Sequence, residues 1–242
     1  LHSISKKFSF FYIEHKNFIG GRYSVLSETG IVPAYLMGVN INKLRKNINK
    51  FLIFNKNSFL KDNAVKLANI LQQKKLSNLI FINYIPELEK FLFWCQQLIA
   101  ESLGKKGKGF FPVISNAPKD HHSLLQLYLD GPKDKIFNIF SIDQKSTGKL
   151  NTKKFTNKIN FLHNKNFNKI KIAQKDALIN DLKEKKIPFR EFKIQEIDEE
   201  TLGQLFFYFI LETIIVGKLV GVNPFDQPAV EQVKKYTIKI LN

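Results

Sequence analysis

The sequence is poor in cysteine: Cys95 is the only one among its 242 residues. A single cysteine cannot form an internal disulfide, and it excludes a cysteine-based zinc site. Because Cys95 stands in an apolar stretch between Trp94 and Gln96, we interpret it as a small core residue and not as a nucleophile. A chain without disulfides is typical of a reducing compartment, so we expect a cytoplasmic location.

Arginine is also scarce. Arg22, Arg45 and Arg190 are the only arginines among 38 basic residues, although the net charge is +17. Proteins that bind nucleic acids usually depend on clustered arginine, whereas the lysines here are dispersed among asparagine, isoleucine and phenylalanine. We therefore expect a solvated, lysine-rich surface and no nucleic-acid partner, while the positive field could still steer a sugar phosphate towards a cleft.

Long hydrophobic runs are missing as well. The longest apolar stretch, residues 205–216, contains Glu212 and falls short of the roughly 18 residues that cross a bilayer. We expect this stretch to form a buried helix and the protein to have no membrane partner. No signal peptide is visible, and the chain begins with Leu1 instead of Met, which favours a missing upstream segment.

Segments of strand length alternate with amphipathic segments through the middle of the chain. The predicted strands are 7–14, 78–85, 109–115 (broken by Pro112), 137–143 and the edge strand 189–197. The predicted helices are 27–47 (with a break at Gly38), 63–75 (capped by Asp62), 87–102 (ended by Gly104), 123–129 (capped by Asp120), 171–185 and 200–220. Residues 144–169 are predicted to connect elements, with at most one helix around 155–162. This alternation predicts one α/β domain over residues 1–242, with a mostly parallel sheet and helices on both faces.

The stretch 20–30 is a candidate binding segment near the amino terminus. Two glycines, Gly20 and Gly21, precede Arg22, and residues with hydroxyl groups follow. Glycine lets the backbone approach a ligand closely, and a guanidinium can hold a pair of anionic oxygens. A plain glycine turn followed by a surface arginine fits the same residues.

A carboxylate in the middle of the chain is a candidate base. Gln97 and Glu101 are four residues apart, so they share one face of the predicted helix 87–102. In the last turn, Glu101 meets the negative end of the helix dipole, which disfavours its charged form and favours uptake of a proton. An exposed glutamate near a frayed helix end is the alternative.

Two adjacent histidines, His121 and His122, are predicted to lie in the first turn of the next helix. The positive end of the helix dipole favours neutral imidazole, which is able to exchange protons with a sugar oxygen near neutral pH. Because adjacent helical residues point about 100° apart and no third ligand stands at helical spacing, we expect no metal site. Surface histidines are the simpler interpretation.

The last segment is predicted to be a helix with Asp226 as its cap and Pro228 in its first turn. Gln227 and Lys234 are seven residues apart and project along one line of this helix. The neighbouring stripe is predicted to enter the core and consists of Val230, Val233 and Thr237. The Gln227–Lys234 line should then border a cleft, although a solvent-facing pair would have the same spacing.

Four of these segments resemble the motifs of phosphoglucose isomerase, the aldose–ketose isomerase of glycolysis and gluconeogenesis. Residues 20–30 and 223–234 resemble its two signatures, the second through Phe-Asp-Gln-Pro, Val-Glu and Lys in register. Residues 96–102, with Gln-Gln followed by Ala-Glu-Ser, match the segment of its proton-transfer carboxylate. Residues 120–123 resemble its histidine segment. The motifs occur in family order and span nearly the whole chain.

The resemblance implies a fold of two flavodoxin-like sugar-isomerase (SIS) domains, of which this chain holds the second, with additional carboxy-terminal helices. The phosphate-binding loop of the family lies in the first domain, so the isolated chain is expected to be incomplete. A homodimer is implied, because the family histidine reaches across from the partner subunit. Leu103 departs from the asparagine that many members have beside the carboxylate.

The resemblance also implies roles for individual residues. Glu101 would move a proton between C1 and C2 of the opened sugar, and Arg22 would stabilise the enediolate. His122 would open the ring with help from Lys234. The substrate-binding residues would be Gln97, Gln227 and Gly21. No metal or organic cofactor is implied. The alternative function is a non-catalytic SIS module that binds sugar phosphates.

Overall fold

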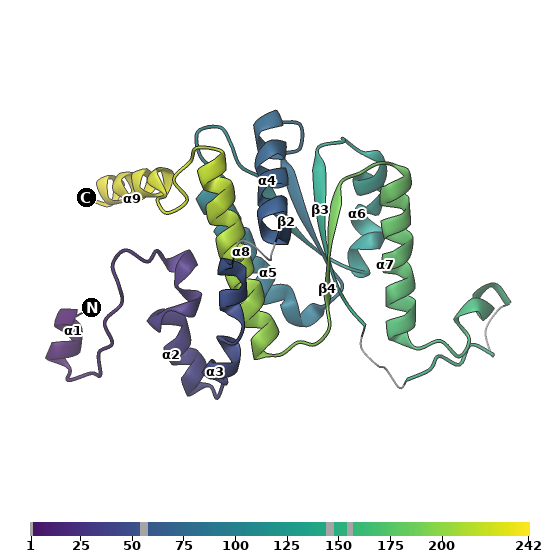
Figure 1. Cartoon of the computed structure of the whole chain (residues 1–242), viewed down its shortest axis with the longest axis horizontal. Coiled ribbons are helices and arrows are strands. Elements are labelled where there is room, and N and C mark those ends of the chain that lie inside the picture. The colour runs from purple at the N-terminus through teal and green to yellow at the C-terminus, as the bar shows by residue number, and fades with distance from the viewer. Residues whose placement is uncertain (1, 54–57, 144–147, 154–156) are drawn as a thin grey trace.

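The computed structural model describes residues 2–53, 58–143, 148–153 and 157–242. These residues contain a parallel sheet of four strands in the order β2-β1-β3-β4 (Figure 1). The strands are β1 (Asn78–Asn83), β2 (Phe111–Asn116), β3 (Lys135–Ile142) and β4 (Phe189–Ile194). The predicted α/β fold with a parallel sheet is confirmed, and β4 lies at an edge as predicted.

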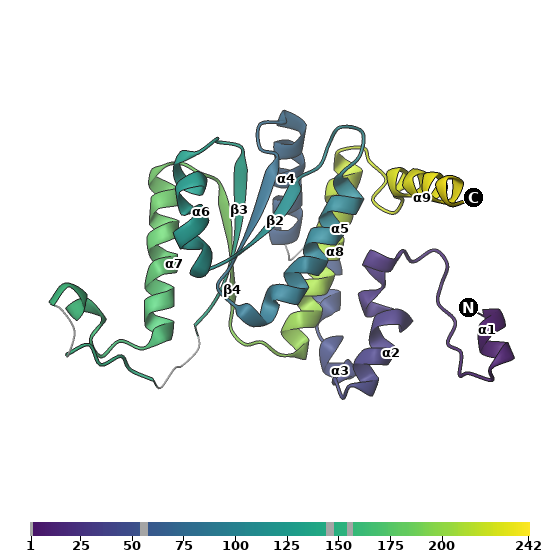
Figure 2. The same ribbon diagram turned by 180° about the vertical axis from the view of Figure 1, so that it is seen from behind.

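Helices cover both faces of the sheet (Figures 1 and 2). One face packs against α4 (Ser58–Gln73), α5 (Glu89–Leu103) and α8 (Glu199–Leu219), and the other against α6 (Lys119–Asp130) and α7 (Phe167–Glu184). Successive residues of β1 alternate between the two cores: Phe81 enters the first, and Ile80 and Ile82 enter the second. Strands buried on both faces read as continuous apolar runs, which explains why these strands are recognisable in the sequence.

Shorter helices complete the fold. They are α1 (His2–Lys7), η1 (Gly21–Leu26), α2 (Glu28–Leu36), α3 (Ile41–Leu44), η2 (Ile48–Leu52), η3 (Pro86–Leu88), η4 (Asn157–Leu162) and α9 (Pro228–Leu241). The break predicted at Gly38 separates α2 from α3, where this glycine adopts φ 87°. The helix predicted around 155–162 lies partly outside the described residues, and η4 covers the rest.

Three predicted helix caps are wrong. Helix α4 begins at Ser58, so Asp62 lies inside it, because the extra turn buries Leu60 in the core. Helix α6 begins before Asp120, whose carboxylate instead accepts a hydrogen bond of 2.7 Å from the backbone N–H of Asn116. Asp226 does not cap α9 either, and its Oδ1 lies 2.9 Å from Nζ of Lys105. A capping residue type shows a local preference, whereas burial decides where each helix begins.

Strand β2 runs through Pro112, which was predicted to break it. Among the described strands, β2 is an edge strand and pairs only with β1. A proline is tolerated there because an edge strand leaves one row of N–H groups without a strand partner.

The strand predicted at residues 7–14 is wrong. Helix α1 ends at Lys7, and the chain has no regular structure from there to Gly20. Phe8, Phe10 and Phe11 are exposed, and the segment extends away from the sheet (Figure 1). An apolar run becomes a strand only where a sheet edge can pair with it, and this segment does not reach one.

Helix α8 corrects the prediction that the apolar stretch 205–216 is too short to cross a membrane. By length and composition α8 could cross one, and it is the only such helix in the part of the chain that the structure describes. A core helix passes the same test, and α8 packs against α4 and α5 with Glu212 only 3% exposed. The prediction of a core helix is therefore confirmed.

Helix α9 also differs from its prediction, because none of its residues is buried. Val230 and Val233 of the predicted core stripe are 42% and 64% exposed. The helix projects from the body of the protein beside the end of α8 (Figure 2). Its apolar periodicity is real, but no described residue covers that face.

Candidate functional site

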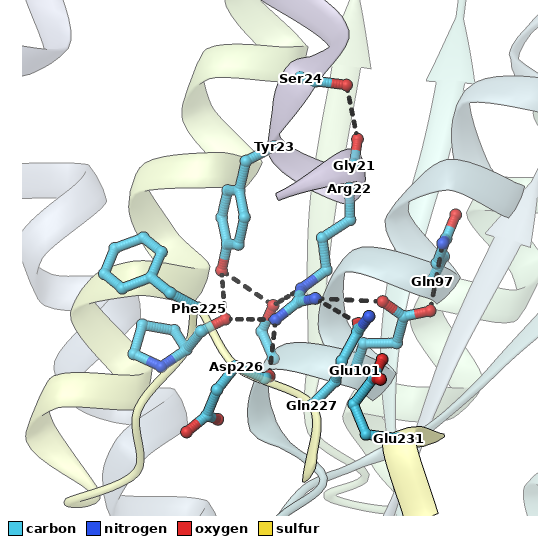
Figure 3. Close-up of polar contacts among 12 residues, drawn as sticks. Gly21, Arg22, Tyr23, Ser24, Gln97, Glu101, Phe225, Asp226, Gln227 and Glu231 are labelled. Carbon is cyan, nitrogen blue, oxygen red and sulfur yellow. Dashed lines mark hydrogen bonds and ion pairs between the residues drawn. The ribbon is translucent and has the colours of Figure 1, made fainter. Parts of the chain in front are cut away.

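Three remote parts of the chain meet at Arg22, whose side chain is 2% exposed (Figure 3). Its Nη1 donates hydrogen bonds to Oε2 of Glu101 at 3.2 Å and to Oε1 of Gln227 at 2.7 Å. These partners lie 79 and 205 residues away in the sequence. The candidate site thus joins η1, the end of α5 and the residue before α9.

The remaining donors of Arg22 are also used. Nε donates to Oγ of Ser102 at 2.9 Å, and Nη2 donates to the carbonyls of Pro224 at 2.7 Å and Asp226 at 2.9 Å. A guanidinium has five N–H donors, so every one of them has an acceptor here. This is how the fold tolerates a buried cation.

Glu101 lies in the last turn of α5, as predicted, and its side chain is 30% exposed. Oε2 accepts the bond from Arg22, and Oε1 accepts a bond of 3.1 Å from Nε2 of Gln97. Glu101 is therefore a hydrogen-bonded carboxylate, partly open to solvent, that can accept a proton.

A hollow of about 540 Å³ opens beside Glu101 and Gln227. Lys105 and Lys106 line it on the α5 side, and the first turn of α9 lines it on the other. Its volume lies within the roughly 300–1,000 Å³ of small-molecule pockets. Gly21 adjoins Arg22, and a Cβ at this position would meet nothing within 4 Å, so its backbone is open to approach.

His122 lies apart from this cluster. It is exposed in the first turn of α6, which starts just after β2 and so stands at the carboxyl ends of the strands. Helix α5 runs back from β1, so Glu101 lies near their amino ends. His121, not His122, makes the internal contact, with Nε2 at 2.7 Å from the hydroxyl of Tyr84. Burial lowers the pKa of His121, which favours the neutral imidazole that we predicted for this turn.

Lys234 is also outside the cluster. It is exposed on α9, and its Nζ lies 2.7 Å from Oε1 of Glu231. The predicted alignment of Gln227 with Lys234 fails because Gln227 precedes the helix and turns towards Arg22. Arg22, Glu101, Gln97 and Gln227 therefore converge, whereas His122 and Lys234 do not join them within this chain.

Several contributors were not predicted from the sequence. Ser102 and Tyr23 both contact the Arg22 network, and Nε1 of Trp94 donates to the backbone carbonyl of Arg22 at 3.0 Å. Ser102 and Tyr23 directly follow Glu101 and Arg22 in the sequence, which was the only available signal for them. In the described part of the chain, no three His, Cys, Asp or Glu side chains gather closely enough to hold a metal ion.

Curated relatives match nearly the whole chain. A protein of Methanococcus maripaludis named probable glucose-6-phosphate isomerase is 36% identical over 97% of this chain and 54% of its own length. Proteins of Mycoplasmopsis pulmonis and Methanocaldococcus jannaschii, both named glucose-6-phosphate isomerase, are 34% and 31% identical over 92% of the chain. The chain spans about half the length of these relatives, 54–56%. No protein-family model matches it.

Solved structures share the fold. A hypothetical protein of Thermus thermophilus superposes with a TM-score of 0.87 at 25% identity, over 99% of this chain and 59% of its own. A glucose-6-phosphate isomerase of Chlamydia trachomatis superposes with a TM-score of 0.75 at 16% identity, over 95% of this chain and 48% of its own. At that identity the second likeness shows the fold alone.

Proposed function

Because the chain belongs to the family of the glucose-6-phosphate isomerases, we propose that it carries the proton-transfer machinery of an aldose–ketose isomerase acting on glucose 6-phosphate and fructose 6-phosphate. The observation that carries the proposal is the contact of Arg22 with both Glu101 and Gln227 beside a hollow. A carboxylate and a buried cation at one point are the two groups that isomerisation through an enediolate needs.

In the proposed reaction, Glu101 removes the proton from C2 of the open-chain aldose and returns it to C1. Electrons from the broken C2–H bond form the enediol double bond, and the carbonyl electrons move onto the oxygen at C1, which becomes negatively charged. When C1 takes up the proton, the hydroxyl proton at O2 passes to the oxygen at C1, which leaves the carbonyl group at C2 of the ketose. Nη1 of Arg22 stabilises this charge by exchanging its bonds to Glu101 and Gln227 for bonds to the charged oxygen. The amides of Gln97 and Gln227 and the backbone at Gly21 are proposed to bind substrate hydroxyl groups.

Ring opening is assigned to His122, with Lys234 assisting at the ring oxygen. Both side chains are exposed, and neither lies at the Arg22 cluster of its own chain. We propose that His122 serves the site of a second subunit in a homodimer. Lys234 would reach the hollow through a change in the position of α9, which no buried residue anchors.

The isolated chain is expected to lack full activity. The relatives are nearly twice as long, and the family resemblance places the phosphate-binding loop in their other domain. Under this proposal the chain supplies the catalytic groups, and a further domain supplies the residues that bind the phosphate group of the substrate. Action in cytoplasmic glycolysis and gluconeogenesis stays a prediction. A module that binds sugar phosphates without catalysis is less favoured, because binding alone needs no base.

The test is exchange of the substrate proton with deuterated solvent, measured by NMR on fructose 6-phosphate. It is run for the chain alone and together with the amino-terminal half of the Methanococcus maripaludis relative. Glu101→Gln should abolish exchange, with a loss of at least about a thousandfold, because an amide cannot accept the proton. Glu196→Gln, at an exposed position outside the cluster, is the matched control.

Unchanged exchange in Glu101→Gln would remove this residue as the base. Binding of fructose 6-phosphate by the paired halves without any exchange in the unmodified protein would favour the non-catalytic module. Full turnover by the chain alone would contradict the proposed need for a second domain.

A further inference from the structure

We infer that Ser102 and Tyr23 are positioning residues, which hold Arg22 in one orientation through a closed hydrogen-bond ring. The ring consists of Arg22, Ser102, Tyr23 and the carbonyl group of Pro224 (Figure 3). The inference about the orientation of Arg22 depends on geometry alone. Its consequence for catalysis rests on the proposed function.

Four hydrogen bonds close the ring. Nε of Arg22 lies 2.9 Å from Oγ of Ser102, which lies 2.8 Å from the hydroxyl oxygen of Tyr23. That hydroxyl lies 3.1 Å from the Pro224 carbonyl, which also accepts a bond of 2.7 Å from Nη2 of Arg22. The ring thus begins and ends on the same guanidinium group.

Only one arrangement of protons satisfies all four bonds. Nε–H of Arg22 can only donate, so Oγ of Ser102 accepts. The Ser102 proton then goes to Tyr23, and the Tyr23 proton goes to the Pro224 carbonyl, which can only accept. With no alternative arrangement, the ring fixes the plane of the guanidinium group and does not merely neutralise its charge.

Burial protects the Arg22 and Ser102 part of the ring from competition by water. The hydroxyl of Ser102 belongs to a fully buried residue, and Arg22 is 4% exposed. Burial also raises the pKa of Tyr23, so its hydroxyl remains protonated and able to donate near neutral pH. Nε1 of Trp94 donates to the backbone carbonyl of Arg22.

The ring divides the donors of Arg22 into two groups. Nε and Nη2 serve the ring and the turn before α9, whereas Nη1 faces Glu101 and Gln227, whose side chains reach the hollow. The two Nη1 bonds lie outside the ring, so they can be exchanged for bonds to a substrate oxygen without opening it. Ser102 and Tyr23 therefore decide which edge of Arg22 meets the reacting atoms, without touching substrate themselves.

The first test follows exchange of the arginine Nε–H protons with water by ¹H–¹⁵N NMR, which is tractable because the chain has only three arginines. Arg22→Lys assigns its signal by loss. We expect Nε–H of Arg22 to exchange far more slowly than that of exposed Arg45. Ser102→Ala should accelerate it about tenfold, and Tyr23→Phe about threefold, in line with the net value of buried hydrogen bonds.

Arg190 serves as the internal reference for folding, because its Nε donates to Asn138 at 2.9 Å in a separate part of the core. Its exchange should be unchanged in both variants. Ser141→Ala, at a buried serine on β3, and Tyr35→Phe, at an exposed tyrosine on α2, are matched controls that should leave Arg22 unaffected. If Ser102→Ala loses the Arg190 signal through unfolding, Tyr23→Phe decides the test.

If the Nε–H proton of Arg22 exchanges as fast as that of Arg45 in the unmodified protein, the inferred hydrogen-bond ring is wrong. Unchanged exchange of this proton in folded Ser102→Ala would also contradict the ring.

The catalytic consequence is tested separately with the two halves of the enzyme. Ser102→Ala should lower kcat about tenfold with KM changed by less than about twofold, because preorganisation acts on the transition state. If the Nε–H proton of Arg22 exchanges slowly but the paired halves show no turnover, the proposed function is rejected and the inference about the hydrogen-bond ring is retained.

Discussion

At the scale of single residues, the fold contains a second buried arginine with its own partners. Nη1 of Arg190 lies 2.5 Å from Oε1 of Glu212, and Nη2 lies 3.2 Å from Oε2. The hydroxyl of Tyr208 donates to Glu212 at 2.7 Å, and Nε of Arg190 donates to Asn138 at 2.9 Å. Glu212, which interrupts the apolar stretch in the sequence, is therefore a core residue paired with β4.

We predict that Glu212→Gln lowers the free energy of unfolding by about 3–5 kcal/mol, because it leaves the buried Arg190 charge without a counter-charge. Urea denaturation followed by circular dichroism measures the change. Glu200→Gln is the control, since the Glu200–Lys46 pair is exposed at the lysine and should contribute less than about 1 kcal/mol. Equal costs for the two substitutions would contradict the assignment of Arg190–Glu212 as a core pair.

At the scale of elements, the start of α8 is defined by a true cap. Oδ1 of Asp198 accepts a bond of 2.8 Å from the backbone N–H of Thr201, and Oδ2 lies 3.0 Å from Nζ of Lys43 on α3. The Thr201 bond, supported by Lys43, lowers the pKa of Asp198 to about 2 from its ordinary 3.8. The cap thus joins α8 to α3 as well as beginning the helix.

We predict that Asp198→Ala lowers the free energy of unfolding by about 1 kcal/mol near neutral pH, the usual value of a helix cap. Because the folded-state pKa is below the unfolded one, this stabilisation is fully present above about pH 4 and is lost as the pH falls towards about 2. Chemical denaturation at several pH values measures the difference from the unmodified protein.

Asp198→Asn is the control for this cap. Asparagine caps helices about as well as aspartate but does not titrate, so its deficit near neutral pH should be smaller than that of Asp198→Ala, and the two deficits should decrease in parallel as the pH falls through this window. A deficit in Asp198→Ala that stays constant down to about pH 2 would show that the charge on Asp198 contributes nothing.

At the scale of the whole molecule, the charge of +17 is the property most open to misreading. Several lysines are committed to local structure: Lys105 pairs with Asp226, Lys135 with Asp134, and Lys175 with Asp176 and Glu191. A nucleic-acid surface needs basic groups aligned along one face and free to bind phosphates. The ion pairs show that part of the basic charge is already balanced by neighbouring acids.

We therefore predict no binding of duplex DNA at physiological salt. Fluorescence anisotropy with a labelled duplex, titrated with the protein at low and at physiological salt, measures this. Weak association at low salt should vanish steeply as salt rises, because it depends on counterion release. A submicromolar Kd at physiological salt would contradict the prediction and favour a nucleic-acid function.

The sequence by itself predicted the strands of the sheet and the core helices. In strands and helices that are buried on one or both sides, the spacing of apolar residues follows which side chains enter the core. It also predicted the residues of the candidate site, of which Arg22, Glu101, Gln97 and Gln227 lie together. It failed at residues 7–14 and at Val230 and Val233, where apolar side chains stay exposed. Local pattern shows that a side chain is apolar but not whether anything packs against it.

Only the tertiary structure decided the orientation of Arg22. Its acceptors come from α5 and from the turn before α9, at separations of 79 to 205 residues that no local pattern can relate. The same holds for His122 and Lys234, whose residue types fit the chemistry but whose positions depend on where α6 and α9 lie. Sequence determines which groups are available because chemistry resides in the side chain, and the fold determines which groups meet because distance depends on packing.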